Sequence, residues 1–273
     1  MQASPAWIPP RGTLGSIVAE ASDRAQALRQ REAELSRAAA RAPATPSLAA
    51  ALRRARVGVI AEIKRRSPSK GWINPDLAAG DQARAYEAGG AAAVSVLTEP
   101  VHFGGSVDDL TAVRAVVGIP VLKKDFHVEP IQLLEAKAIG ASAALLIARA
   151  LSPERLARMV EYARTIDLAV LVEVRDEDEV ARALDVGATI IGINNRNLES
   201  LVIEAGTAER LLARVPANVA AVSESGVESR ADVERVARAG ADAVLVGSAI
   251  SAAADPTAAV RDLASVPRVS RAD

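Results

Sequence analysis

Short apolar runs alternate with amphipathic segments along most of the chain. The runs are nearly continuous in Val, Ile, Leu and Ala, which is typical of parallel strands buried on both faces. Between them apolar residues recur at intervals of three and four, as in the segment that opens with Ser152 and Pro153, a helix cap followed by a first-turn proline. The eight runs are residues 57–63, 91–97, 119–122, 143–147, 168–174, 188–193, 218–222 and 243–246. This alternation predicts an α/β fold with a parallel sheet.

A Gly-Ala pair introduces every second run. The pairs begin at Gly90, Gly140, Gly187 and Gly240, where glycine can end a helix in the left-handed conformation before the next strand. Eight strands with this regular recurrence predict a closed (βα)₈ TIM barrel. A doubly wound open sheet shares the βα alternation, but its GxGxxG fingerprint is absent after the first run.

Residues 1–52 do not follow the pattern. Residues 16–42 indicate a charged, alanine-rich helix that ends before Pro43, and Ser47 indicates the cap of a second, short helix. We therefore expect an N-terminal helical extension over residues 1–52 and a (βα)₈ barrel catalytic domain over residues 53–273. The extension is expected either to close the bottom or side of the barrel or to cover its catalytic mouth.

Composition excludes several function classes. The 273 residues hold 33 basic and 34 acidic side chains, so the chain has no positive excess for binding nucleic acid. Cysteine is absent, which excludes disulfides, a thiolate nucleophile and cysteine-based metal sites. The chain begins with no signal-like segment and contains no 18 uncharged apolar residues in succession. We therefore expect no membrane association and a cytoplasmic location.

Lysine is rare and is concentrated after the predicted strands. Of five lysines in the chain, four follow strand ends, at Lys64, Lys70, Lys123 and Lys124, whereas arginine supplies most of the positive charge elsewhere. Barrel enzymes build their active sites at the carboxyl ends of the strands. The lysines therefore indicate that this end of the barrel is the catalytic face.

Glu62 and Lys64 form the most suggestive pair. They lie two residues apart on one strand, so both side chains point to the same side, towards the mouth of the barrel. A carboxylate and an ammonium held together can exchange protons, and lysine suits this work because its pKa moves readily on burial. The alternative is a structural ion pair that seals the barrel. Lys124, Glu173 and Glu224 at other strand ends favour acid–base chemistry.

Glycine and serine mark a candidate phosphate site. Ser225-Gly226 follows the seventh run and Gly247-Ser248 the eighth, where barrels commonly bind phosphate through backbone N–H groups. Ser67 follows the first run, which neighbours the eighth in a closed barrel. Taken alone, each Gly-Ser pair could simply form a tight turn.

Aromatic residues also gather after strands. Phe103, Phe126 and Trp72 all do so, in a chain with only 2% aromatic residues. They would suit an aromatic substrate ring, and loop packing is the alternative. His102 and His127 occupy the same loops without the spacing of metal ligands, so we expect loop or surface histidines and no metal site.

Together these motifs resemble those of the indole-3-glycerol-phosphate synthases, over essentially the whole barrel. The resemblance implies ring closure of 1-(2-carboxyphenylamino)-1-deoxyribulose 5-phosphate, with loss of carbon dioxide and water, in tryptophan biosynthesis. It also implies a carbon–carbon lyase that needs neither metal nor organic cofactor. The motifs are Ile60-Ala-Glu62-Ile-Lys64-Arg-Arg-Ser67-Pro-Ser, Val96-Leu-Thr-Glu99, Leu122-Lys-Lys124-Asp-Phe126, Leu171-Val-Glu173-Val, Ile191-Gly-Ile-Asn194-Asn-Arg196-Asn-Leu198 and Ser223-Glu224-Ser-Gly226.

Residue roles follow from the resemblance. Lys124 would be the general acid that protonates the ketone, and Glu173 the general base. Lys64 would pair with the carboxylate that leaves and serve in dehydration, with Glu62 orienting it. Asn194 and Glu224 would hold substrate hydroxyls and developing charge, supported by Arg196. The remaining binding residues would be Ser67, Ser225, Gly226, Gly247 and Ser248 for phosphate, and Phe103, Phe126, Leu145 and Leu198 for the ring.

Two further lysines allow alternatives. Lys123, where the family often has arginine, would either depress the pKa of Lys124 as a neighbouring charge or face outward. Lys70 is a candidate substrate clamp.

Three other functions are compatible with parts of this pattern. A phosphoribosyl-sugar isomerase of the same pathway type would need a cysteine that the chain lacks. In a Schiff-base aldolase, Lys124 would attack a carbonyl. A catalytically silent barrel would serve as a binding partner, although every charged strand end is present. We expect one phosphorylated small-molecule substrate and a monomer or weak homo-oligomer.

Overall fold

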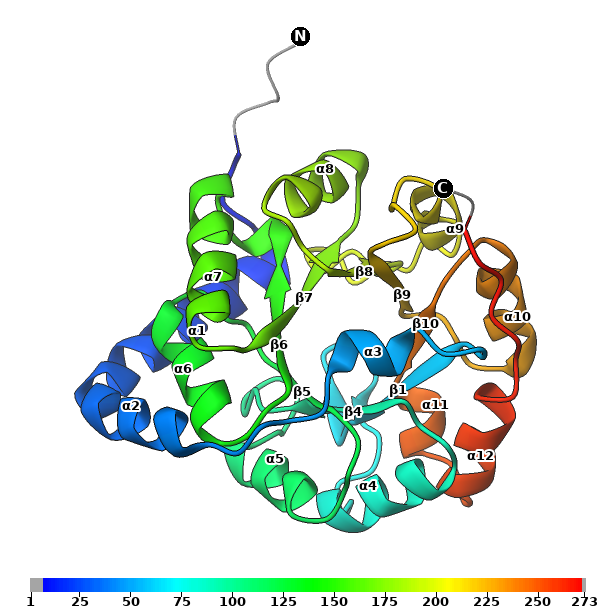
Figure 1. Ribbon diagram of the computed structural model, residues 1–273, viewed down its shortest axis with the longest axis horizontal. Coiled ribbons are helices and arrows are strands. Elements are labelled where there is room, and N and C mark those ends of the chain that lie inside the picture. The colour runs from blue at the N-terminus through cyan, green and yellow to red at the C-terminus, as the bar shows by residue number, and fades with distance from the viewer. Residues whose placement is uncertain (1–6, 272–273) are drawn as a thin grey trace, which may run out of the picture.

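The computed structural model describes residues 7–271 and contains a closed, eight-stranded parallel barrel (Figure 1). The predicted (βα)₈ architecture is confirmed, and the open-sheet alternative is wrong. A two-stranded hairpin of β2 (Arg66–Ser67) and β3 (Gly71–Trp72), which the sequence pattern did not predict, follows β1. The barrel strands are β1 (Gly58–Ile63), β4 (Ala93–Leu97), β5 (Val121–Lys124), β6 (Ala143–Ile147), β7 (Ala169–Val174), β8 (Ile190–Asn194), β9 (Ala220–Glu224) and β10 (Ala243–Val246).

Helices surround the barrel and cover the outer face of every strand (Figure 1). Within residues 7–271, no helix combines the length and the apolar character needed to cross a membrane. The helices of the barrel are α4 (Ala79–Ala88), α5 (Val107–Arg114), α6 (Pro130–Ala138), η2 (Ala148–Ala150), α7 (Pro153–Thr165), α8 (Glu177–Asp185), α9 (Thr207–Leu212), α10 (Arg230–Arg238), α11 (Ser248–Ser251) and α12 (Pro256–Leu263).

The N-terminal extension meets the barrel at three places. Its long helix begins earlier than predicted and is interrupted by a 3₁₀ turn, giving α1 (Gly12–Leu28), η1 (Arg29–Arg31) and α2 (Glu32–Arg41). Leu14 and Ile17 of α1 line the cavity at the mouth, while Leu35 of α2 packs beside α6. The predicted cap is confirmed, since the Ser47 hydroxyl accepts the Ala50 N–H at the start of α3 (Leu48–Leu52).

Helix α3 lies across the barrel in Figure 1, at the end where the strands begin. The Cα atom of Leu52 lies 3.4 Å from the position that a Cβ on Gly58 would take, at the start of β1. Both alternatives for the extension are therefore correct, for different segments: α1 covers the mouth and α3 closes the bottom. Residues 1–6 of the extension lie outside the described residues, and the proposed boundary after residue 52 coincides with the end of α3.

The four predicted helix-ending glycines are confirmed. They follow α4, α6, α8 and α10, which lead into β4, β6, β8 and β10. Each has a positive φ, 92° at Gly90, 81° at Gly140, 71° at Gly187 and 97° at Gly240. Side chains disfavour this region because Cβ approaches the following carbonyl.

We expect Gly140→Ala to lower the free energy of unfolding by about 1–2 kcal/mol. A Cβ at this position would meet only ordinary contacts with Arg114, at 3.9 Å, so the cost is conformational. Gly80→Ala in α4, where φ is not positive and a Cβ would meet only ordinary contacts at 3.7 and 3.8 Å, is the matched control and should keep or slightly raise stability. Urea unfolding of both variants measures the difference, and equal stability would contradict the expectation.

Candidate active site

A cavity of about 790 Å³ lies at the carboxyl ends of the barrel strands. Most of the predicted site residues line it, so the structure brings them together at this end of the barrel. The lining residues from the predicted set are Glu62, Lys64, Ser67, Phe103, Lys124, Phe126, Leu145, Glu173, Asn194, Arg196, Leu198, Ser225 and Ser248.

Three of its walls carry one continuous network of charges. Lys64 Nζ on the loop after β1 lies 2.9 Å from Glu62 Oε1, as the two-residue spacing predicted. Lys124 Nζ on β5 lies 2.8 Å from Glu224 Oε2 and 3.6 Å from Glu62 Oε2. Glu62 therefore joins the two lysines, and Glu224 belongs to the same network.

Both members of the Lys124–Glu62 contact are held in their charged forms. Burial lowers the pKa of Lys124, but the carboxylates of Glu224, Glu62 and Glu173 outweigh it, so the pKa is raised above its usual value. Burial raises the pKa of Glu62, but Lys64 and Lys124 bring it below the usual value. In the free enzyme, Lys124 therefore carries a proton that it can donate.

Glu173 on β7 behaves differently. Burial and then the nearby charge of Glu224 raise the pKa of Glu173 to about 8, although Lys124 acts in the opposite direction. Asn194 Nδ2 on β8 donates a hydrogen bond of 2.9 Å to Glu173 Oε1 and so fixes the carboxyl group. Near neutral pH the group is poised between its protonated and ionised forms, as general acid–base catalysis requires.

Lys123 faces away from the cavity. Its Nζ lies 3.0 Å from Glu135 Oε2 on α6 and 3.7 Å from Asp125 Oδ2, in a buried cluster between barrel and helix. Alternate strand residues point to opposite faces, so Lys124 points inward and Lys123 outward. The alternative in which Lys123 depresses the pKa of Lys124 is wrong, because that pKa is raised. The outward-facing alternative is confirmed, although the side chain is buried.

The structural role of Asp125 was not evident from the sequence. Its Oδ1 accepts the Phe126 N–H at 2.8 Å and pairs with Arg24 of α1 at 2.9 Å, and its Oδ2 accepts the Thr98 hydroxyl at 2.6 Å. Burial raises the pKa of Asp125, but Lys123 and Arg24 outweigh it and lower the pKa to about 2. The ionised carboxylate thus ties α1 to the turn that carries Phe126.

The apolar wall of the cavity can hold a ring. Phe103 and Phe126 lie 6.2 Å apart between ring centroids, and Leu145 and Leu198 complete the predicted set. Trp72 is exposed and packs under the Arg66 guanidinium at 5.6 Å, so loop packing explains it. Sequence reasoning missed Leu14 and Ile17 from α1, and Leu97 and Ile147 from strand ends, as further lining residues.

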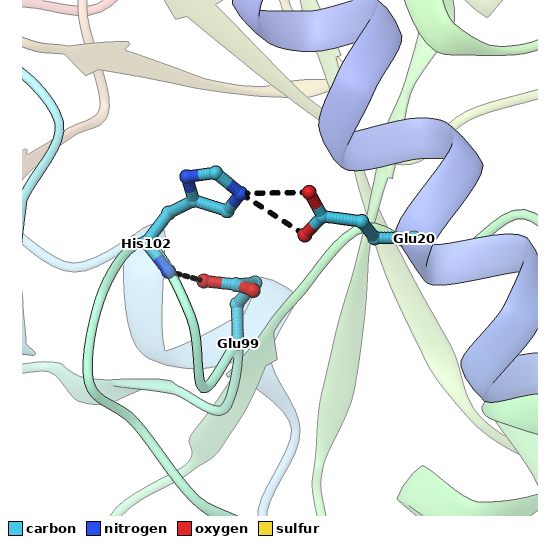
Figure 2. A group of neighbouring side chains, drawn as sticks. All are labelled: Glu20, Glu99 and His102. Atoms are coloured by element: carbon cyan, nitrogen blue, oxygen red, sulfur yellow. Dashed lines mark hydrogen bonds and ion pairs between the residues drawn. The ribbon is translucent and has the colours of Figure 1, made fainter.

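Glu99 shapes the loop after β4. Its carboxylate accepts backbone N–H groups from Val101, His102 and Phe103 at 2.7–3.0 Å, which fixes the turn that presents Phe103. Figure 2 shows the His102 ring beside Glu20 of α1. His102 Nε2 lies 3.0 Å from Glu20 Oε2. Backbone N–H groups already occupy both oxygens of Glu99. Glu20, Glu99 and His102 together therefore form a contact between α1 and the loop after β4.

The two histidines do lie in loops, as predicted, but His127 is not at the surface. It is buried, and its Nδ1 lies 2.7 Å from the Leu145 carbonyl oxygen. Burial and the charge of Lys123 lower the pKa of His127 to about 3, so the ring is neutral.

A cavity of about 570 Å³ adjoins the network on the side of β9 and β10. Its walls include Ser225, Gly226, Gly247 and Ser248, together with Lys70, whose Nζ lies 3.4 Å from Glu228. Ser225 and Gly226 both have positive φ, 62° and 79°, which is strained for serine.

The loop after β8 is braced by asparagines. Asn194 Oδ1 accepts the Arg196 N–H at 2.9 Å, and Arg196 donates from its guanidinium to the Leu201 carbonyl at 2.8 Å. Asn195, not predicted to have a part, is buried and donates from Nδ2 to the Ser225 carbonyl at 2.9 Å. Asn195 thus holds the Ser225 turn beside the network.

A closed (βα)₈ barrel with partly buried lysines beside buried carboxylates at the carboxyl ends of its strands defines an enzyme. The family model described as indole-3-glycerol phosphate synthase matches residues 14–263. Indole-3-glycerol phosphate synthase from Streptomyces griseus is 51% identical over 230 residues, which are 84% of this chain and 86% of that protein. Indole-3-glycerol phosphate synthase 2 from Streptomyces coelicolor is 47% identical over 92% of this chain and 98% of its own length.

The chain therefore belongs to the indole-3-glycerol phosphate synthase family, and its activity is that of a carboxy-lyase of tryptophan biosynthesis. Solved structures share the fold alone. Thiamine phosphate pyrophosphorylase from Pyrococcus furiosus has a TM-score of 0.58 and 18% identity, over 76% of this chain and 93% of that one. For 3-hexulose-6-phosphate synthase from Salmonella typhimurium, the TM-score is 0.59 and the identity 18%, over 76% and 97%.

We expect Glu173→Gln to stabilise the fold at pH 8 and to have no effect at pH 4. An acid whose pKa rises from 4.5 to about 8 on folding destabilises the folded state progressively as the pH rises between those values. Glutamine keeps a side-chain oxygen that accepts the hydrogen bond from Asn194, and it removes this dependence of stability on pH. The gain at pH 8 should be on the order of 2–4 kcal/mol.

Urea unfolding at the two pH values measures this gain. Glu161→Gln on the exposed face of α7 is the matched control and should leave both values unchanged. A Glu173→Gln effect that is equal at pH 4 and pH 8 would contradict the raised pKa.

Proposed function

We propose that the network of Lys124, Glu62, Lys64, Glu173 and Glu224 closes the indole ring of 1-(2-carboxyphenylamino)-1-deoxyribulose 5-phosphate. The observation that carries the assignment is the position of Lys124 Nζ, 2.8 Å from Glu224 and 3.6 Å from Glu62. These contacts keep the ammonium protonated and aimed into the cavity.

Lys124 acts as the general acid. As the ring carbon that bears the carboxylate attacks the ketone carbon, negative charge develops on the ketone oxygen, and Lys124 donates a proton to it. An alkoxide is a far stronger base than a lysine amine, so a raised pKa does not prevent this transfer. The carboxylates around Lys124 stabilise the ammonium form that must be present before the attack.

Lys64 acts at the leaving groups. Its ammonium pairs with the substrate carboxylate until the carbon–carbon bond breaks and carbon dioxide leaves, with the bonding electrons returning to the ring. Lys64 then supplies a proton to the departing hydroxyl group in dehydration, and Glu62 at 2.9 Å keeps it oriented.

Glu173 acts as the general base in its ionised form. It removes the proton that must be lost from carbon for the pyrrole double bond to form as water leaves. Asn194 holds the carboxyl group through one oxygen, so the other is free to accept that proton. A pKa of about 8 leaves a substantial ionised fraction near neutral pH and makes the carboxylate a stronger base than an exposed glutamate.

The phosphate and the aromatic ring of the substrate contact different walls of the cavity in this proposal. The phosphate is proposed to lie at the strained turn of Ser225 and Gly226, with Gly247, Ser248 and Ser67 beside it. The aromatic ring is proposed to lie between Phe103, Phe126, Leu145 and Leu198. Lys70 on the phosphate side supports electrostatic attraction of the substrate as it enters.

The enzyme is further proposed to work in the cytoplasm as a monomer or weak homo-oligomer. The biosynthetic role of its family supports the location, and no bound metal or organic cofactor is required by the roles assigned above.

We expect Lys124→Ala to lower kcat by about 10²–10⁴-fold, the usual contribution of a general acid. The phosphate and ring walls are untouched, so KM should change far less. Formation of the indole product, followed by its fluorescence, measures both constants. Lys137→Ala on α6, whose Nζ contacts Asp167 away from the cavity, is the matched lysine control and should retain full activity.

Borohydride added during turnover tests the aldolase alternative. An acid does not form a bond to the substrate, so the mass of the protein should stay unchanged. A reduced adduct on Lys124 would establish a Schiff base and overturn the assignment, as would near-normal kcat in Lys124→Ala.

A further inference from the structure

Gly192 occupies the middle of β8, between the strands that carry Glu173 and Glu224. It pairs with Glu173 across the β7–β8 ladder, and Asn194, two residues further on, pairs with Glu224 across the β8–β9 ladder. Residues two apart on a strand share a face, so position 192 faces the barrel interior like Asn194. A glycine inside a strand weakens the strand and often marks a close approach.

The backbone itself does not require glycine at this position. Gly192 is not among the glycines with positive φ, so its conformation suits any residue. Space, however, forbids a side chain: a Cβ on Gly192 would overlap Glu224 Oε1 and come within 3.1 Å of Glu224 Cδ and 2.7 Å of Leu171 Cδ2. Glu224 therefore lies in the space that a side chain at position 192 would fill.

This placement determines what each oxygen of Glu224 can contact. Oε2 reaches Lys124 Nζ at 2.8 Å. Oε1 is buried against Gly192 and accepts no hydrogen bond from an N–H or hydroxyl group of residues 7–271. A hydrogen bond with the carboxyl group of Glu173 helps to raise the pKa of Glu173. The Lys124 contact and the close fit over Gly192 together hold the Glu224 carboxylate in place.

We propose that Gly192 is a positioning residue, whose missing side chain lets the Glu224 carboxylate lie over β8, in contact with Lys124 and close to Glu173. The inference rests on the proposed roles of Lys124 and Glu173. It adds that the missing side chain at position 192 determines the surroundings of both the general acid and the general base.

Two consequences follow from filling that vacancy. Moving Glu224 removes the closest partner of Lys124, so the ammonium group is no longer held in its catalytic position. It also moves a negative charge away from Glu173, whose pKa should then fall. The substitution leaves the charges of the other groups near Glu173 unchanged: these groups are Lys124 from β5, Asn194 from β8, and Arg149, Arg175, Glu179 and Arg196 around the adjoining cavity of about 560 Å³.

The test is Gly192→Ala. We expect kcat to fall on the order of 10–100-fold, as for small misplacements of catalytic groups. KM should stay within about threefold, because the phosphate and ring walls are untouched. The acidic limb of the kcat/KM profile should also move to lower pH. Unchanged kcat and an unchanged limb would overturn the proposal.

A second background separates positioning from general disturbance. In Glu224→Asp the carboxylate is one methylene shorter and retreats from position 192, so adding Gly192→Ala should then change kcat less than threefold. The contact with Leu171 is the same in both backgrounds. A loss of equal size in the two backgrounds would show that Leu171 packing is responsible and would overturn the proposal.

Folding of the variants is checked by thermal unfolding, with Gly80→Ala as the glycine control. The atoms that the new Cβ meets are ends of flexible side chains, so we expect Gly192→Ala to fold. If it does not, both backgrounds are compared with Leu171→Val added, which removes the second clash. The result for Lys124→Ala keeps the outcomes distinct: an inactive Lys124→Ala with a normal Gly192→Ala rejects only the role of Gly192.

Discussion

The active site depends on the partly buried ammonium of Lys124, which carboxylates surround. Lys124 offsets the cost of burying Glu224 and Glu62, and they in turn keep it protonated. Removing either sign would leave the other uncompensated in a region of low dielectric, which is why such groups act as one unit. Glu173 is the exception, since burial beside Glu224 favours its neutral form. The network thus holds a ready acid and a base of raised strength within one cavity.

Much of the fold and site could be predicted because two periodicities are local. Runs of apolar residues located all eight strands, and the period of two placed Glu62 and Lys64 together. Strand ends converge in any closed parallel barrel, so residues far apart in sequence, such as Lys124 and Glu224, were expected at one face. The rarity of lysine made those positions conspicuous, and the family resemblance supplied roles that spacing alone leaves open.

Other features depend on contacts that no local pattern encodes. Whether Lys123 acts on Lys124 was decided by Glu135 on α6, which pairs with it outside the barrel. The place of the extension depends on long-range pairs such as Arg24 with Asp125. In the sequence, Gly192 was recognisable only as part of a motif. The side chain that excludes a Cβ at this position belongs to a neighbouring strand. Each of these is tertiary information, settled by packing between elements rather than within them.

Burial beside Glu224 raises the pKa of Glu173 to about 8, whereas Glu62 stays charged between two lysines. Carbon-13 NMR of the glutamate side-chain carboxyl groups, assigned with Glu173→Gln and Glu62→Gln, follows both through a pH titration. We expect Glu173 to titrate near pH 8 and Glu62 below 4.5. Titration of Glu173 near 4.5, the value for an exposed glutamate, would contradict the account.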